Sequence, residues 1–292
     1  MASKVCDAAS RARRGRFAVI LGANEIASAV AVALCRAGWS VALSHDPYPP
    51  VIRRKMAFHD VLFGDEIVIE GVRGELVEMA FALSRAFAKP DCVAVTPLLL
   101  TDLMMFARVD VLIDARMQKR NVAPDLRSLA RLTIGLGPEF HVGRNCDLAI
   151  ETRPDHVGEI VESGGTLPDD GLARGLGGVR AERFIYAERA GLWHAPVDIG
   201  VRVYQRMTLG LLDGRPVVAP MDGVLRGIAR DGLRVPAGVK LLEIDPRGRR
   251  AQVTGVDKRG RAIAEAALIA LDRKAVELWA DNVIAFAARG EV

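Results

Sequence analysis

Short apolar runs alternate with helical patterns along the first part of the chain. Phe17–Gly22 and Val41–Ser44 are apolar runs, and Ile26–Ala37 between them has the composition of a buried helix that Gly38 ends. A strand, a helix and a second strand in so short a stretch form a βαβ unit, which implies a parallel sheet. Further strands are expected at Glu66–Glu70, Val93–Thr96 and Val111–Asp114, and further helices at Glu75–Ala88 and Asp102–Arg108. We therefore expect a Rossmann-like α/β domain over residues 1–125.

Glycines are concentrated in the middle segment, residues 126–186, above all between Ser163 and Gly178. A strand is expected at Leu148–Glu151. Glycines at this density serve either the close approach of a ligand to the backbone or a mobile link, and composition leaves both readings open. Gly135 and Gly137 are the candidates for letting a ligand come near the backbone.

An internal repeat follows in residues 187–246. At an offset of 32 residues the matches are Ala187 with Ala219, Gly191 with Gly223, Gly200 with Gly232, Arg202 with Arg234, Val203 with Val235, Leu209 with Leu241, and Leu212 with Ile244. Each copy consists of short apolar pairs broken by turns and is too small for a core of its own, so the two copies are expected to interlock into one small sandwich. This layout resembles the biotinyl/lipoyl barrel-sandwich hybrid.

The hairpin between the two copies bears on function. Carrier versions of that fold place a modifiable lysine there, whereas this chain has Leu212–Pro216 without a lysine, and Lys240 lies inside the second copy. We therefore expect no covalent biotin or lipoate. Residues 247–292 are expected to return to the first domain through a helix at Ala262–Leu271.

Composition and charge exclude several classes of protein. The chain carries 40 Lys and Arg against 36 Asp and Glu, a net charge of +4, and 5 % aromatic residues, which argues against a nucleic-acid binder. Its four cysteines are far apart and no apolar run is long enough for a membrane span. We expect a cytoplasmic protein. His141, Cys146 and His156 match no zinc spacing, so no metal is expected.

The first turn after the first strand is a candidate nucleotide site. Gly22 stands where a dinucleotide fingerprint has its first glycine, but Asn24 takes the place of the second. Asp46, at the end of the second strand, is where a ribose-binding acid would lie. Nucleotide binding and a fold without a cofactor both remain open at this point.

Three further polar positions are candidates for anion or crevice contacts. Arg53 and Arg54 form a pair that can clamp a phosphate, or else a solvated charge run. Asp114 lies at the carboxyl end of an expected parallel strand, where α/β sheets bind ligands, or else caps a helix. Asn121 follows it and would line the same crevice.

A longer series of short matches occurs in a consistent order along residues 17–272. They are Gly22-Ala23 with Ala27, Arg36–Gly38, Pro50–Arg54, Phe58, Val111–Ala115, Asn121, Ile134–Phe140, Ile150–Arg153, Ala219–Gly223, Gly227, Arg230–Gly232, Val239-Lys240, Asp245–Gly248, Asp257-Lys258 and Arg261–Ile263. In these the chain resembles the YqeB-type family of accessory proteins for selenium-dependent molybdenum hydroxylases, which is associated with the XdhC group of maturation factors. The resemblance alone adds Asp257 and Lys258 to the candidate cofactor-binding residues.

The resemblance implies a cytosolic maturation factor that handles or inserts a pterin-type or other phosphate-bearing cofactor, with an apo molybdenum hydroxylase or another maturation protein as its partner. An NAD(P)-dependent oxidoreductase that uses Gly22 and Asp46, and a non-catalytic scaffold, are the alternatives. The sequence leaves open whether a reaction is catalysed, which enzyme is the client, and whether the chain forms a homo-oligomer.

Overall fold

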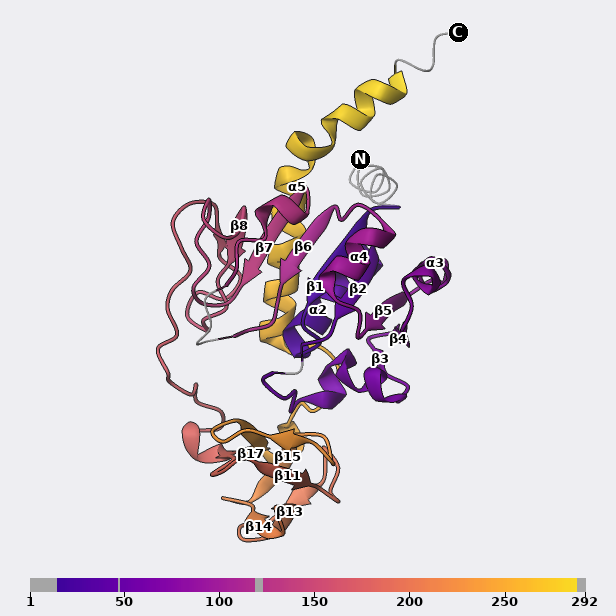
Figure 1. Ribbon diagram of the computed structural model, residues 1–292. Helices are drawn as coiled ribbons and strands as arrows, with labels where there is room; N and C mark the ends of the chain where they lie inside the picture. The colour runs from indigo at the N-terminus through magenta and orange to yellow at the C-terminus, as the bar shows by residue number, and fades with distance from the viewer. Residues whose placement is uncertain (1–14, 47, 119–122, 288–292) are drawn as a thin grey trace.

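The computed structural model describes residues 15–46, 48–118 and 123–287, with side chains up to residue 275 (Figure 1). Nine strands of the described residues form one large sheet. In spatial order they are β3 (Val68–Ile69), β4 (Val72–Leu76), β5 (Cys92–Thr96), β2 (Ser40–Ser44), β1 (Phe17–Leu21), β6 (Val111–Asp114), β7 (Leu132–Leu136), β8 (Leu148–Ile150) and β9 (Ile160–Val161). The strands pair in parallel from β4 to β8, whereas β3 and β9 are antiparallel edges. The central strands are buried on both faces, as parallel strands between helices require.

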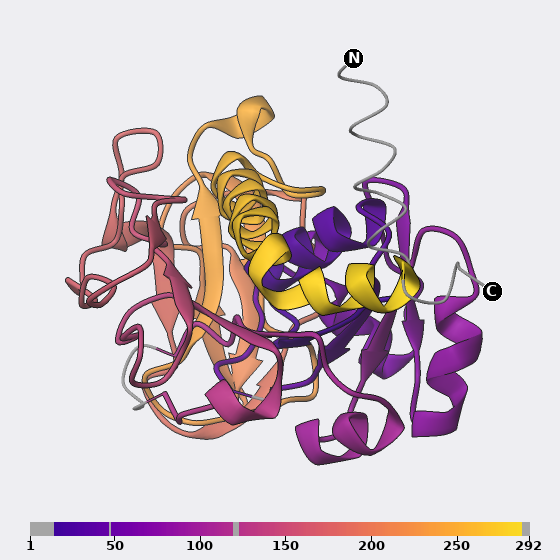
Figure 2. The same cartoon turned by 90° about the horizontal axis from the view of Figure 1, so that it is seen from above.

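Helices cover this sheet on both sides. α2 (Glu25–Arg36) and α5 (Lys258–Ala287) share one apolar core, and α3 (Leu83–Phe87) and α4 (Leu100–Phe106) belong to another. Figure 2 shows α5 running beside α2. Small residues permit this close approach, since a Cβ on Gly260 would lie 3.1 Å from the Cβ of Ala29.

Residues 184–245 form a separate β module of two antiparallel sheets. Among the described residues one sheet has the order β10 (Phe184–Tyr186), β17 (Lys240–Asp245), β15 (Gly223–Ile228) and β12 (Arg202–Val203). The other has the order β14 (Arg215–Val218), β13 (Thr208–Leu212), β11 (Gly191–His194) and β16 (Arg234–Val235). β11, β12 and β13 begin 32 residues before β15, β16 and β17 respectively, and each sheet holds strands of both copies. The predicted 32-residue repeat is therefore confirmed, with Trp193 fully buried in the shared core.

The predicted fold class, a Rossmann-like parallel sheet followed by a biotinyl/lipoyl-like barrel-sandwich hybrid and a C-terminal helix, is wrong. The large sheet is mixed, and β7, β8 and β9 come from the glycine-rich middle segment, which the prediction left outside the sheet. β10, from before the repeat, joins the β module. The strand expected at Leu148–Glu151 corresponds to β8. β7 and β9 were missed because runs of five and two residues are too short for a periodic signal.

Two helix predictions also need correction. Glu75–Ala88, expected as one helix, is divided between β4, the 3₁₀ turn Ala80–Ala82 and α3. The expected helix at Ala262–Leu271 is part of the much longer α5, which begins at Lys258. In the described part of the chain, no helix combines the length and the apolar character that a bilayer crossing requires.

Residues 51–55, which we call the junction segment, tie the large sheet to the β module. The carbonyl of Ile52 accepts a hydrogen bond from the N–H of Ile228 in β15 (2.8 Å), and Gly227 beside it leaves room, since a Cβ there would lie 3.1 Å from the Ile52 carbonyl oxygen. Lys55 Nζ donates to the carbonyl of Ile199 (2.8 Å) and pairs with Asp198. The two parts are therefore joined by backbone and side-chain contacts that the chain makes far from its own sequence neighbours.

Candidate basic cleft

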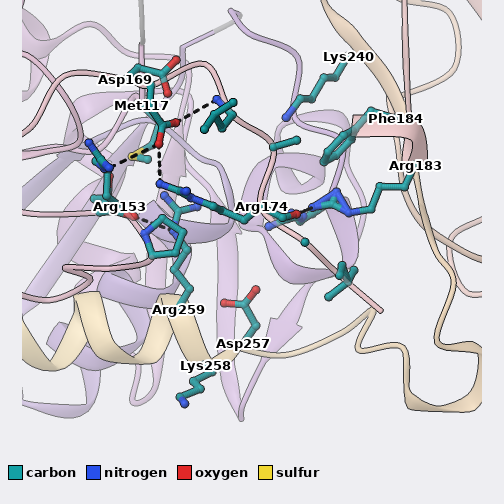
Figure 3. A pocket seen from close by; sticks show the side chains of 18 of the residues that line it. Met117, Arg153, Asp169, Arg174, Arg183, Phe184, Lys240, Asp257, Lys258 and Arg259 are labelled. Atoms are coloured by element: carbon teal, nitrogen blue, oxygen red, sulfur yellow. Dashed lines mark hydrogen bonds and ion pairs between the residues drawn. The ribbon is translucent and has the colours of Figure 1, made fainter. Parts of the chain in front are cut away.

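A cleft lies between the large sheet and the β module. It consists of two adjoining pockets of about 380 Å³ and about 240 Å³. Five residues line both: Arg53, Met117, Phe184, Lys240 and Arg259. The larger pocket is walled by residues 151–154 after β8, by the loop 167–176, by the β module and by the start of α5 (Figure 3).

Cationic side chains outnumber carboxylates in the larger pocket. The cations among its described lining residues are Arg53, Arg153, Arg174, Arg183, Arg226, Lys240, Arg247, Lys258 and Arg259, and the carboxylates are Glu151, Asp169, Asp170 and Asp257. Carboxylates behind the wall neutralise part of this charge, as Asp245 does for Arg247 (2.6 Å). The ligands that the cleft can bind therefore depend on which of these cations are not paired with a carboxylate.

Glu243 is the centre of the largest charge network beside the cleft. It is fully buried in β17 and lies 2.8 Å from Arg53 Nε, 3.2 Å from Arg226 Nη1 and 3.6 Å from Arg183 Nη1. Burial opposes its charge, but these arginines, Arg53 first, hold the pKa of Glu243 below its usual range. Arg53 has a second partner in Glu25 (3.0 Å), and Arg226 has a second partner in Asp257 (3.1 Å).

Within the part of the chain that the structure describes, Arg183 pairs with no carboxylate besides Glu243. Its residue is 5 % exposed, and its Nε and Nη1 atoms have no hydrogen-bond partner among the described residues. Nη2 donates only to the backbone carbonyl of Arg174 (3.1 Å), and the guanidinium stacks over the ring of Phe184 at 4.0 Å from its centroid. Burial lowers the pKa of Arg183, and repulsion from Arg53 and Arg226 adds to this against the opposing effect of Glu243.

Arg259 is the second cation of this kind. Its Nε donates to the carbonyl of Thr152 (3.1 Å), and it forms no ion pair with a carboxylate of the described residues. Burial lowers the pKa of Arg259, and repulsion from Arg53 adds to this against the opposing effects of Glu25, Asp257 and Glu151. Among the described residues, neither Arg183 nor Arg259 thus forms a hydrogen bond to a carboxylate.

The residues predicted for a nucleotide site lie together along the smaller pocket. Gly22, Asn24 and Asp46 all line it. Asn24 caps α2, since its Oδ1 accepts from the N–H groups of Ile26 and Ala27 (both 3.0 Å). Its Nδ2 donates to the carbonyl of Ala115 (2.7 Å), so both ends of the side chain have partners within the chain. Asp46 accepts from Gln118 Nε2 (2.7 Å) and from a backbone N–H (3.0 Å).

The side chains of the two neighbouring arginines predicted to contact phosphate have different surroundings. Arg53 reaches the cleft, but its guanidinium donates to Glu243 and Glu25. Arg54 is not among the residues that line the cleft; it donates to the carbonyl of Ile228 (2.9 Å) and pairs with Asp60. Both arginines hold the junction segment in place.

The remaining predicted residues around β6 and β7 contact the chain itself. Asp114 binds Arg116 through both of its oxygens (2.9 and 2.6 Å). A Cβ on Gly135 would lie 2.1 Å from the ring of Phe140, so this glycine makes room for an aromatic ring. Gly137 has a φ of +116°, which favours glycine, and it does not line the cleft. Asn121 lies outside the described residues.

Asp257 and Lys258, suggested by the family resemblance alone, both line the larger pocket at the start of α5. Sequence reasoning missed Arg183, Arg259 and Glu243. Glu243 could have been noticed as a charge inside the otherwise apolar run Leu241–Ile244. Nothing local distinguishes Arg183 from the other arginines of the chain.

Fold and site define a mixed α/β protein with an attached, internally duplicated β module and a basic cleft between the two. No family model matches the chain. Over 260 residues, 88 % of its length, the chain is 34 % identical to a protein of Escherichia coli K12 described as uncharacterized protein YqeB, and it spans about half of that relative's length (47 %). The chain is thus related to YqeB over most of its length, which supports the YqeB-type family predicted from the sequence.

The chain also has a weak similarity to two solved structures. A succinylglutamate desuccinylase/aspartoacylase from Rhodobacter sphaeroides is 14 % identical, covers 79 % of this chain and 85 % of its own, and has a TM-score of 0.26. The ectoine utilization protein EutE (DoeB) from Ruegeria pomeroyi is 11 % identical, covers 79 % and 86 %, and has a TM-score of 0.24. TM-scores this low carry no argument about the fold or the activity of this chain.

Proposed function

We propose that the protein binds a phosphate-bearing small molecule in the basic cleft and serves as a maturation factor for a molybdenum-containing hydroxylase, handling or inserting a pterin-type cofactor. The binding part is supported by the chemistry of the cleft. The maturation part is supported by the similarity to the YqeB-type family, whose accessory role the sequence resemblance implies. Its partner would be the apo hydroxylase or another maturation protein in the cytoplasm.

The observation that carries the proposal is the buried guanidinium of Arg183. A charged group removed from water costs several kcal/mol unless it is well paired. Among the described residues, Arg183 has one backbone carbonyl (3.1 Å) and Glu243 at 3.6 Å, a carboxylate that Arg53 and Arg226 share. Proteins keep such uncompensated groups at functional sites, where a ligand supplies the missing partner. An anionic ligand is the partner that a guanidinium binds best.

The cleft also offers apolar surface beside these charges. Met117, Pro138, Leu172 and Phe184 line the larger pocket together with the arginines. Sites for cofactors combine apolar walls with a few placed polar groups. A ligand with a ring system and a phosphate fits this combination better than a bare inorganic ion.

Thermal unfolding of the purified full chain tests the binding. We expect stabilisation by a purified molybdopterin-type cofactor, because a ligand at 100 times its Kd adds about 2.7 kcal/mol. NAD(P)H and free nucleotides are the comparison ligands, and stabilisation by NAD(P)H alone would indicate the oxidoreductase instead. Arg183→Met should abolish the shift, whereas Arg234→Met removes an exposed arginine of the β module and should leave it unchanged.

Deletion of the gene tests the maturation role. The client hydroxylase should still be made but should carry little pterin cofactor, and the gene variant encoding Arg183→Met should restore loading poorly. A fully loaded client in the deletion strain would contradict the proposal.

A further inference from the structure

The first turn of α5 carries positive side chains, whereas negative side chains stabilise the first turn of a helix. The helix is 30 residues long, and its first two residues, Lys258 and Arg259, are cationic, with no acid in the turn. The amino end of a helix carries partial positive charge, so cations there are unfavourable and anions are bound. Asp257, just before the helix, caps it through the N–H of Gly260 (2.8 Å), but its other oxygen is taken by Arg226.

Of the two cations, Arg259 lines both the larger and the smaller pocket of the cleft. Figure 3 shows Arg259 and Lys258 leaving the start of α5 in different directions, with Arg259 extending into the cleft. Its bond to the Thr152 carbonyl fixes the guanidinium between α5 and the end of β8. Arg259 is therefore held where it adds to the positive end of the helix.

A second, independent feature of the same cleft points to a ligand. Arg183 enters from the β module, is buried, and has two nitrogens without a hydrogen-bond partner among the described residues. Arg183 and Arg259 come from different parts of the fold, and both line the larger pocket. One anionic group can compensate cations from both walls.

We propose that the phosphate group of the ligand binds at the amino end of α5, contacted by Arg259 and completed by Arg183 from the β module. The inference rests on the proposed function, since it locates the phosphate of the ligand that the cleft binds. A phosphate carries about −1.5 to −2 charges at neutral pH and three acceptor oxygens, which suits two guanidiniums and a helix end. The ligand then bridges the large-sheet part and the β module.

Isothermal titration calorimetry with inorganic phosphate and pyrophosphate, at constant ionic strength, tests the site. Arg259→Met and Arg183→Met should each weaken binding at least tenfold, and the matched control Arg234→Met should not change it. Malonate, a dicarboxylate, should bind more weakly than pyrophosphate. Equal binding of malonate, or unchanged phosphate binding in Arg259→Met, overturns the inference.

Stability without ligand separates this role from a structural one. Because Arg259 is a cation at the positive end of a helix, Arg259→Met should melt at or above the temperature of the unchanged protein. A strongly lowered melting temperature would assign Arg259 to the structure and overturn the inference.

Titration of the pterin-type cofactor distinguishes the two proposals. If the cofactor binds the protein and Arg259→Met equally, the phosphate site is wrong and the proposed function stands. If phosphate and pyrophosphate bind through Arg259 but the cofactor does not bind, the proposed function fails and the site stands.

Discussion

Two pairs of arginines, in the junction segment and in the cleft, have opposite surroundings. Arg53 donates to Glu243 and Glu25, and Arg54 pairs with Asp60 and a backbone carbonyl. Arg183 and Arg259 are also largely buried, yet backbone carbonyls are their only hydrogen-bond acceptors among the described residues. The difference shows in the pKa values, since the pKa of Arg53 is raised by Glu243 and Glu25 despite its burial, whereas burial lowers those of Arg183 and Arg259.

The comparison teaches that an arginine's role depends on the carboxylates the fold brings to it. The first pair stabilises contacts that exist in the folded chain. The second pair costs stability until an anion arrives. Substitution should therefore weaken the fold at the first pair and weaken ligand binding at the second.

Removal of the shared carboxylate should have the largest effect on stability. Glu243→Gln leaves the positive charges of Arg53, Arg183 and Arg226 without their common counter-charge, and we expect the free energy of unfolding to fall by about 3–5 kcal/mol. Urea denaturation measures it. Glu188→Gln, at an exposed position, is the control and should change stability by less than about 0.5 kcal/mol. An equal, small effect of both would mean that the network does not hold the junction.

Acid should remove the same contribution. The pKa of Glu243 is lower in the folded than in the unfolded chain, so its stabilisation is complete above the unfolded pKa of about 4.3 and is lost as pH falls through the folded value. The stability difference between the unchanged protein and Glu243→Gln should therefore shrink below about pH 4. Urea denaturation from pH 7 to pH 3 measures it, and a difference that grows toward acid would contradict the assignment.

Gly135 tests the contrast between packing and ligand approach. Gly135→Ala should lower stability by about 1–3 kcal/mol, because the new methyl group overlaps the Phe140 ring. Gly175→Ala is the matched control, since a Cβ there meets only Arg180 Cγ at 4.0 Å. Thermal or urea unfolding of both variants measures the two changes in stability. Unchanged stability in Gly135→Ala would contradict the packing role and favour the predicted approach of a ligand at β7.

Asn24 should have the smallest effect of the four. Asn24→Ala removes the cap of α2 and the bond to Ala115, and should cost about 1–2 kcal/mol. Asn24→Asp keeps the acceptor for the helix and should cost less. If both variants unfold alike, the bond to Ala115 rather than the cap is the important contact.

Local signals predicted some elements well. The apolar runs at residues 17–22 and 41–44 coincide closely with β1 and β2, and the helix between them with α2, because a βαβ unit is specified by contiguous residues. The repeat was visible because seven positions recur at one spacing. The strand expected at Leu148–Glu151 became β8, but β7 and β9 escaped prediction because strands this short become recognisable only beside their partners.

The site was predicted less well than the fold elements, for a similar reason. Gly22, Asn24, Asp46, Arg53, Asp257 and Lys258 do line the cleft. Whether an arginine there is paired depends on contacts such as Arg53 with Glu243, which are 190 residues apart in the sequence. Composition and spacing carry no information about such long-range pairing.

The duplicated β module is symmetric in its backbone but not in its chemistry. Lys240 and Glu243 of the second copy lie beside the cleft, whereas the positions 32 residues earlier are Thr208 and Leu211, both exposed. Among the described residues, the charge network around Glu243 therefore includes no side chain of the first copy. The hairpin residues Asp213 and Gly214 are exposed. A fluorescent label or an affinity tag can therefore be attached at that hairpin without altering the arginines around Glu243.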